Sequence, residues 1–125
     1  KYITVDTEDG SEAFFETGTI TATLSDLLVM DSVLASSLLV NAILETPVAQ
    51  ETPEIVLKYS LVENSEQLEQ FYEYIACDTP IYTDEEIKSL LLKTTNPNLT
   101  LEDLQEMADN FSVSEVAERK QAQAE

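Results

Sequence analysis

The sequence predicts a small α+β domain: an N-terminal antiparallel β-hairpin or small sheet, a central apolar helix, and a mostly helical C-terminal half. Three observations lead to this prediction. Short alternating segments on either side of Asp9-Gly10 indicate paired strands near the N-terminus. The stretch from Leu27 to Glu45 is apolar around most of a helical wheel. After Asn64, apolar residues recur at helical spacing behind good capping residues.

The N-terminal strands are predicted from alternation and turn chemistry. Tyr2–Asp6 alternates apolar and polar residues, and Asp9-Gly10 is a strong hairpin-turn signal. The return strand is expected over Ala13–Phe15. Thr19–Leu24 alternates again, with apolar residues on one side and threonines on the other. We therefore expect two or three antiparallel strands before the first long helix.

The central helix is expected over Leu27–Glu45. Ser25 is a suitable N-cap, and Asp26 is well placed against the helix dipole. A helix that is apolar nearly all round is either central in its domain or covered by a partner. Its small polar side is expected to consist of Ser32, Ser36, Ser37 and Asn41.

A polar linker and one further strand are expected after this helix. Thr46-Pro47 ends the helix, and the stretch to Pro53 has the composition of a linker. Strand character returns over Glu54–Val62. The residues expected on one face of that strand are Ile55, Leu57, Tyr59 and Leu61.

The second half of the chain is predicted to be helical, with each helix marked by its cap. Asn64 or Ser65 opens a helix whose apolar residues form one stripe, and Thr83–Glu86 matches a capping box. Thr100 caps the next helix, and Ser112 begins a last one. We expect one compact domain over residues 1–117 and a frayed polar tail over residues 118–125.

The net charge is the strongest guide to partners. The protein has 25 acidic and 6 basic residues, a formal net charge of −19. Between Lys1 and Lys58 there are ten carboxylates and no basic side chain. Binding to DNA or RNA requires lysine and arginine to displace counterions, and an anionic membrane repels such a chain. We therefore expect basic protein surfaces as partners, with no direct nucleic-acid or membrane binding.

Residue types exclude several kinds of chemistry. The chain has no histidine, which excludes serine–histidine and cysteine–histidine nucleophile pairs and zinc sites built with histidine. Its single cysteine, Cys77, cannot form an intrachain disulfide. We expect no enzyme activity, no cofactor and no metal site. Neither a membrane span nor a signal-peptide pattern is present, so we expect a cytoplasmic protein of a bacterial or host cell.

One spacing of carboxylates keeps an enzyme alternative open. Glu66 and Glu69, with Glu106 and Asp109, resemble the paired Glu-x-x-Glu and Glu-x-x-Asp helices of all-helical nucleotide pyrophosphatases. The resemblance implies a Mg²⁺-dependent nucleotide phosphohydrolase. The long gap between the two pairs and the scarcity of basic residues favour solvated helix faces instead.

These observations predict a non-enzymatic, highly acidic module that occupies a basic surface on a partner protein. In its sharpest form it is a nucleic-acid mimic or inhibitor of viral or mobile-element type, whose carboxylates replace phosphates. The alternative is a structural or assembly component, a virion or complex subunit or its chaperone, joined as a homo-oligomer or multisubunit complex through the Leu27–Glu45 helix. The expected partner-binding residues are Glu66, Glu69, Glu73, Asp84, Glu85, Glu86, Glu8, Asp9 and Glu12.

Overall fold

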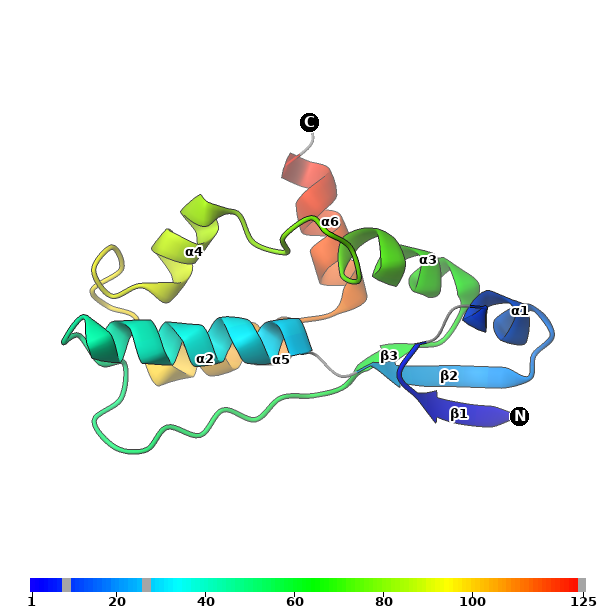
Figure 1. Cartoon of the computed structure of the whole chain (residues 1–125), viewed down its shortest axis with the longest axis horizontal. Coiled ribbons are helices and arrows are strands. Elements are labelled where there is room, and N and C mark those ends of the chain that lie inside the picture. The colour runs from blue at the N-terminus through cyan, green and yellow to red at the C-terminus, as the bar shows by residue number, and fades with distance from the viewer. Residues whose placement is uncertain (8–9, 26–27, 124–125) are drawn as a thin grey trace. The chain divides into compact units, whose positions relative to one another are not determined.

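The structure is a computed structural model of the chain and describes residues 1–7, 10–25 and 28–123, apart from the side chains of Leu28 and Gln123 (Figure 1). The described residues form three strands and six helices, which confirms the α+β class with its small N-terminal sheet and mostly helical remainder. The elements are β1 Tyr2–Val5, α1 Ser11–Glu16, β2 Ile20–Ser25, α2 Leu28–Ile43, β3 Ser60–Val62, α3 Ser65–Tyr74, α4 Asp84–Leu91, α5 Leu101–Asn110 and α6 Val113–Gln123.

The chain divides into two compact units, each assembled from separate segments. We call Lys1–Asp26, Tyr59–Ile81 and Phe111–Glu125 the sheet unit, because they hold all three strands. We call Leu27–Lys58 and Tyr82–Asn110 the helical unit, which holds α2, α4 and α5. The expectation of one domain over residues 1–117 stays a prediction.

The sheet is mixed, and the predicted N-terminal hairpin is wrong. The strand order is β1-β2-β3, with β1 parallel to β2 and β2 antiparallel to β3. The expected return strand, Ala13–Phe15, lies inside α1. Gly10 has φ 90° and stands at the N-cap of that helix. A helix placed between two strands carries the chain back to the starting end of the sheet, so the strands pair in parallel.

The sheet buries its small polar residues. Thr23 is 1% exposed, and its hydroxyl donates to the Asp6 carbonyl at 2.9 Å. Thr23 pairs with Val62 of β3, which is fully buried. Within the sheet unit, α1 contacts β2 and α3, and α3 contacts β3 and α6 (Figure 1). On the other face of β2, Leu24 pairs with exposed Val5 and exposed Leu61, whereas Ala22 is buried.

The strand expected over Glu54–Val62 is also shorter and oriented differently. Only Ser60–Val62 pairs in the sheet, and Tyr59 and Leu61, from the expected inner face, are exposed. The main chain at Val56 is satisfied in another way. The Gln105 side chain of α5 accepts from its N–H and donates to its carbonyl, both at 2.9 Å. These two bonds replace the ladder that a longer strand would need.

The interior of the helical unit contains half of the small polar side predicted for its long helix. The core face of α2 includes Met30 and Leu34 together with Ser37 and Asn41, the last fully buried. Ser32 and Ser36, the other residues of that polar side, are exposed. The large apolar residues exposed on α2 and just after it are Val29, Leu39, Val40, Ile43 and Leu44.

The helix caps predicted at Asn64, Thr83, Thr100 and Ser112 are confirmed. Asn64 accepts from the N–H of Gln67 at 2.9 Å, and Ser112 accepts from the N–H of Glu115 at 3.1 Å. Thr83 forms a complete capping box. Thr100 accepts from the N–H of Asp103 at 3.2 Å. The expected cap at Ser25 is followed by residues 26–27, which lie outside the described part, and Ser25 itself ends β2.

The C-terminal helix is longer than expected. α6 extends through Gln123, where the sequence predicts a frayed tail from residue 118. Two basic side chains fix it within the sheet unit. Arg119 donates to the Ile81 carbonyl at 2.7 Å, and Lys120 donates to the carbonyls of Tyr74 at 2.8 Å and Thr79 at 3.2 Å. These contacts hold the segment without any large apolar residue.

Candidate functional site

Three of the predicted acidic residues form a stripe along α3, which we call the α3 acidic stripe. Glu66, Glu69 and Glu73 are spaced i, i+3, i+7 and so lie on one helical face. All three are exposed, while Leu68 and Phe71 on the opposite face are buried. None of the three carboxylates forms a hydrogen bond or ion pair with another described side chain. The stripe therefore presents its full negative charge outward from the sheet unit.

This stripe is unfavourable for the helix that carries it. Glu69 and Glu73 are like charges at i, i+4, which costs a helix about 0.2–0.5 kcal/mol. Glu73 lies in the last turn, close to the negative end of the helix dipole, where a carboxylate costs about 0.3–1 kcal/mol. α3 has no basic residue in that turn to compensate. Burial of Leu68, Phe71 and Ile75, together with the Asn64 cap, stabilises α3 despite these charges.

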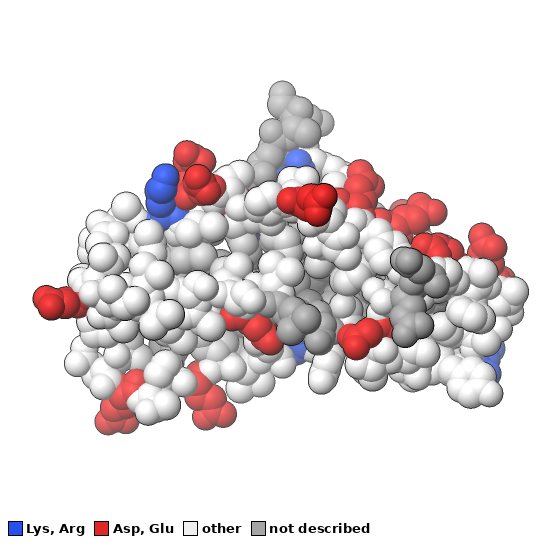
Figure 2. All heavy atoms as spheres, in the orientation of Figure 1, with Lys and Arg blue, Asp and Glu red and all other residues white. Residues whose placement is uncertain are grey.

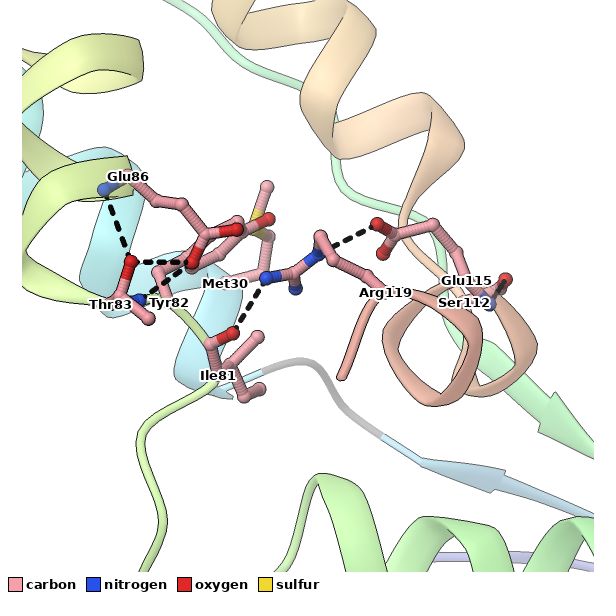
Figure 3. Close-up of polar contacts among 8 residues, drawn as sticks. All are labelled: Met30, Ile81, Tyr82, Thr83, Glu86, Ser112, Glu115 and Arg119. Atoms are coloured by element: carbon pink, nitrogen blue, oxygen red, sulfur yellow. Dashed lines mark hydrogen bonds and ion pairs between the residues drawn. The ribbon is translucent and has the colours of Figure 1, made fainter. Parts of the chain in front are cut away.

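The acids at the start of α4 differ from one another in what they contact. Asp84 and Glu85 are exposed in the first turn. The Glu86 carboxylate instead accepts from the Thr83 N–H at 2.7 Å and from the Thr83 hydroxyl at 2.9 Å (Figure 3). Glu86 is thus half-buried and closes the capping box. Of the three α4 acids, Asp84 and Glu85 are therefore the exposed ones.

The predicted acids near the N-terminus give no joint site in the described residues. Glu8 and Asp9 lie outside the described part of the chain. Glu12 is half-buried in the first turn of α1, which is a short helix. The α3 stripe and Glu12 belong to the sheet unit, whereas the α4 acids belong to the helical unit.

A second set of exposed acids lies on α5 in the helical unit. Glu102 and Glu106 are exposed at i, i+4. Asp109 continues the same face and forms an ion pair with Lys58, with Nζ and Oδ1 2.6 Å apart. Hydrogen bonding by that ammonium group lowers the pKa of Asp109 below its ordinary value. Sequence reasoning weighed Glu106 and Asp109 as metal ligands against a solvated helix face, and both are exposed on α5.

The carboxylates of the enzyme alternative are divided between the two units. Glu66 and Glu69 are in the sheet unit, and Glu106 and Asp109 are in the helical unit. Among the described residues, no group of three or more histidine, cysteine, aspartate or glutamate side chains is placed to hold a metal ion.

Several basic side chains donate hydrogen bonds to main-chain carbonyls. Lys93 Nζ donates to the Pro47 carbonyl at 3.3 Å, and Lys120 bonds two carbonyls, as described above. Arg119 donates both to the Ile81 carbonyl and, through Nε, to Glu115 at 3.0 Å (Figure 3). Cations that bond carbonyls leave more of the acidic side chains without a neutralising neighbour. The visible face of the molecule accordingly shows more acidic than basic groups (Figure 2).

The helical unit contains an apolar cavity that sequence reasoning did not anticipate. Its volume is about 280 Å³. We call it the α2–α4 groove, lined by Val29, Val33 and Val40 of α2 and by Ile87, Leu91 and Leu92 in and after α4. The hydroxyl-bearing residues on its α2 side are Ser32, Ser36 and Ser37. Among the described residues no helix has both the length and the apolar character needed to cross a bilayer.

Comparison of the chain with protein-family models, with curated proteins and with solved structures gives no match.

Proposed function

We propose that this protein is a non-enzymatic binding module whose exposed carboxylates occupy a basic surface on a partner protein. The observation that supports this most is the α3 acidic stripe. Glu69 and Glu73 destabilise their own helix, and their charges are not compensated within the described part of the chain. Residues that lower stability without an internal compensating contact are typical of functional sites.

The net charge of the chain indicates that the partner's surface is positively charged. With 25 acidic residues and 6 basic ones, the protein repels phosphate backbones and attracts lysine- and arginine-rich surfaces. Complementary charge raises association rates and suppresses wrong partners. Both units contribute, because the sheet unit holds 14 acidic and three basic residues and the helical unit holds 11 acidic and three basic residues.

The most specific form of the proposal is a nucleic-acid mimic. Glu66 and Glu73 are seven residues apart, which corresponds to about 10 Å along a helix axis. Nucleic-acid phosphates also form a regular row of negative charges, which basic proteins contact through several side chains at once. A basic protein that tracks phosphates can therefore contact the three carboxylates of the stripe in the same way, and the two ligands would compete.

The test is capture of a basic protein from nuclease-treated native lysate at about 50 mM salt, followed by elution with rising salt. The decisive variant is Glu66→Gln/Glu69→Gln/Glu73→Gln. A matched control, Glu51→Gln/Glu54→Gln/Glu106→Gln, removes the same amount of charge from exposed positions elsewhere. We expect the stripe variant to lose capture at lower salt than the control, and added duplex DNA to displace the captured protein.

Two results would count against this proposal. Equal weakening by the two triple variants would show that only total charge matters and that the α3 stripe is not the site. Capture that survives high salt without change would exclude an electrostatic contact altogether.

A second candidate function is supported by a different observation. α2 exposes Leu39 and Ile43, which are 62% and 69% accessible, on a helix whose core face includes buried Asn41. Exposed apolar surface of this kind is typical of subunits that assemble. If the protein is an assembly component, light scattering will show a defined oligomer. A monodisperse monomer would remove this candidate's support.

A further inference from the structure

We propose that the α2–α4 groove is the docking site for an amphipathic, lysine- or arginine-rich helix of the partner. The inference rests on the proposed function for the charge of the partner, and it adds where the apolar side of that partner binds. Four features of the helical unit support it: an apolar lining, continuity along α2, rigid walls and surrounding negative charge.

The lining of the groove is apolar and accessible. Val29 and Val40 are 40% and 38% exposed, and Ile87 opposite them on α4 is 36% exposed. Val29, Val33 and Val40 follow the i, i+4, i+11 spacing of one helical stripe, between which Ser32 and Ser36 leave room. Such a groove between two helices accepts large aliphatic or aromatic side chains spaced i, i+3/i+4, i+7 on a third helix.

The same apolar stripe continues beyond the groove. Ile43 and Leu44 extend it to the end of α2 and are 69% and 46% exposed. Asp31 is the one charged residue in α2, and at about 100° per residue it falls on the opposite side from Val33 and Val40. The stripe therefore offers several turns of mainly apolar surface that carries no charge, which matches a helix better than a small ligand.

Buried hydrogen bonds fix the two walls of the groove. The Ser37 hydroxyl donates to the Leu91 carbonyl at 2.8 Å, and Asn41 Nδ2 donates to the same carbonyl at 2.7 Å. Asn41 Oδ1 accepts from the Lys93 N–H at 2.8 Å. These bonds hold the end of α4 against α2 at the groove. A preformed groove binds with less ordering cost than one that must assemble.

Charge selects the occupant. α4 holds three carboxylates and one lysine, Lys88, and Asp84 shares the helical stripe of Ile87 and Leu91. Of the other two cations in the helical unit, Lys58 is paired with Asp109 and Lys93 bonds the Pro47 carbonyl. A second copy of this chain brings the same excess of negative charge and is repelled. A helix with lysine or arginine beside its apolar face is attracted.

The probe is a synthetic 18-residue amphipathic helix with leucine on one face and lysine on the other, a length of about five turns. Its binding is measured by fluorescence anisotropy. The test variant is Val40→Gln/Ile87→Gln. The matched control is Leu39→Gln, on the same helix and exposed, but directed about 100° away from Val40. We expect the double variant to bind at least about tenfold more weakly and the control to bind within about twofold of the wild type.

A second measurement guards against loss of folding in the variants. A polarity-sensitive dye attached through Ser36→Cys in a Cys77→Ser background reports occupation of the groove directly. We expect its emission to shift to the blue when the lysine–leucine peptide is added. No shift would overturn the proposal.

Other outcomes are equally decisive. A leucine peptide with glutamate in place of lysine that binds as tightly would overturn the charge assignment. A scrambled lysine–leucine peptide that binds as tightly would overturn the groove as the site. A dimer of the free protein that Val40→Gln dissociates would identify a second copy as the occupant. The two proposals fail in different experiments. If Glu66→Gln/Glu69→Gln/Glu73→Gln leaves capture of the basic protein unchanged, the proposed function is wrong, whereas the peptide and dye measurements test only the groove.

Discussion

At the scale of single residues, Asn41 shows how one buried polar side chain fixes its surroundings. Asn41 has no exposed surface, and its side-chain amide bonds the Ser37 and Leu91 carbonyls while its oxygen accepts from Lys93 N–H. The Asn41 side chain thus bonds three main-chain groups. Two of them, the Leu91 carbonyl and the Lys93 N–H, lie at and after the end of α4, where Asn41 takes the place of a backbone partner. Such a residue specifies one arrangement of α2 and the Leu91–Lys93 segment, because no apolar side chain can make these bonds.

The first prediction concerns this residue. Asn41→Leu leaves the Lys93 N–H and one acceptor site of the Leu91 carbonyl without a partner in the interior. We expect it to lower the free energy of unfolding by about 2–4 kcal/mol. Ser36→Ala, on the exposed side of the same helix, is expected to change it by no more than about 0.5 kcal/mol. Urea unfolding measures both. An Asn41→Leu protein as stable as the wild type would show that the network contributes nothing.

The second prediction concerns strain at the end of α2. Glu45 has φ 59°, the left-handed region, while the Thr46 N–H bonds the Asn41 carbonyl at 2.9 Å. This is the position at which helices usually place glycine. We expect Glu45→Gly to raise the free energy of unfolding by about 1 kcal/mol. Glu45→Ala removes the same charge but keeps the Cβ, so an equal gain in that control would attribute the effect to charge.

The third prediction concerns acid stability. The hydroxyl and then the N–H of Thr100 donate to Asp103, both at 2.7 Å, and lower its pKa below the ordinary value of 3.8. A lowered folded-state pKa means that the stabilisation is present above pH 3.8 and is lost as the pH falls below it. The stability difference between wild type and Asp103→Asn should therefore shrink below that pH. In a Thr100→Ala background, the stability difference between the proteins with and without Asp103→Asn should depend much less on pH. If its pH dependence is unchanged in that background, the Thr100 hydrogen bonds are not the cause of the lowered pKa.

At the scale of elements, local signals were predicted well and tertiary ones were not. Caps at Asn64, Thr83, Thr100 and Ser112 depend on neighbouring residues only, so the sequence predicts them directly. The orientation of α2 depends on which main-chain groups elsewhere need a partner. Nothing near Asn41 in the sequence indicates that Leu91 and Lys93 require it.

The hairpin prediction failed for a related reason. The turn signal at Asp9-Gly10 is compatible either with a hairpin or with the start of a helix at Gly10, and alternation alone does not distinguish parallel from antiparallel pairing. The α3 acidic stripe could be predicted because the apolar residues of that helix keep a regular spacing. The α2–α4 groove could not be predicted, because it requires knowing that Ser37 and Asn41 of α2 face the interior.

The fourth prediction applies to α3 as an element. Glu73→Lys removes a like-charge pair with Glu69 and places a cation in the last turn, so we expect the free energy of unfolding to rise by about 0.5–1 kcal/mol. Glu66→Lys has the same charge change in the first turn and is expected to lower it. Thermal unfolding at low salt measures both. If both variants shift the midpoint of thermal unfolding in the same direction, the overall charge of the protein, and not the helix dipole of α3, determines the change in stability.

At the scale of the whole molecule, apolar and acidic surfaces occur together on both units. The sheet unit exposes Ile3, Val5 and Leu61 and also carries the α3 acidic stripe. The helical unit combines the α2–α4 groove with Asp84 and Glu85. A partner that is both basic and apolar would engage both kinds of surface, with charge setting the rate of encounter and apolar burial setting the lifetime of the complex.

The salt dependence of partner binding is the most direct measurement of the central claim, that the exposed carboxylates bind a basic surface. We predict that the affinity for the captured basic protein falls at least about tenfold between about 50 and about 200 mM salt, and that Glu66→Gln/Glu69→Gln/Glu73→Gln flattens this dependence more than the matched control. An affinity that stays constant across this range, or an equal slope for the two triple variants, would contradict the account.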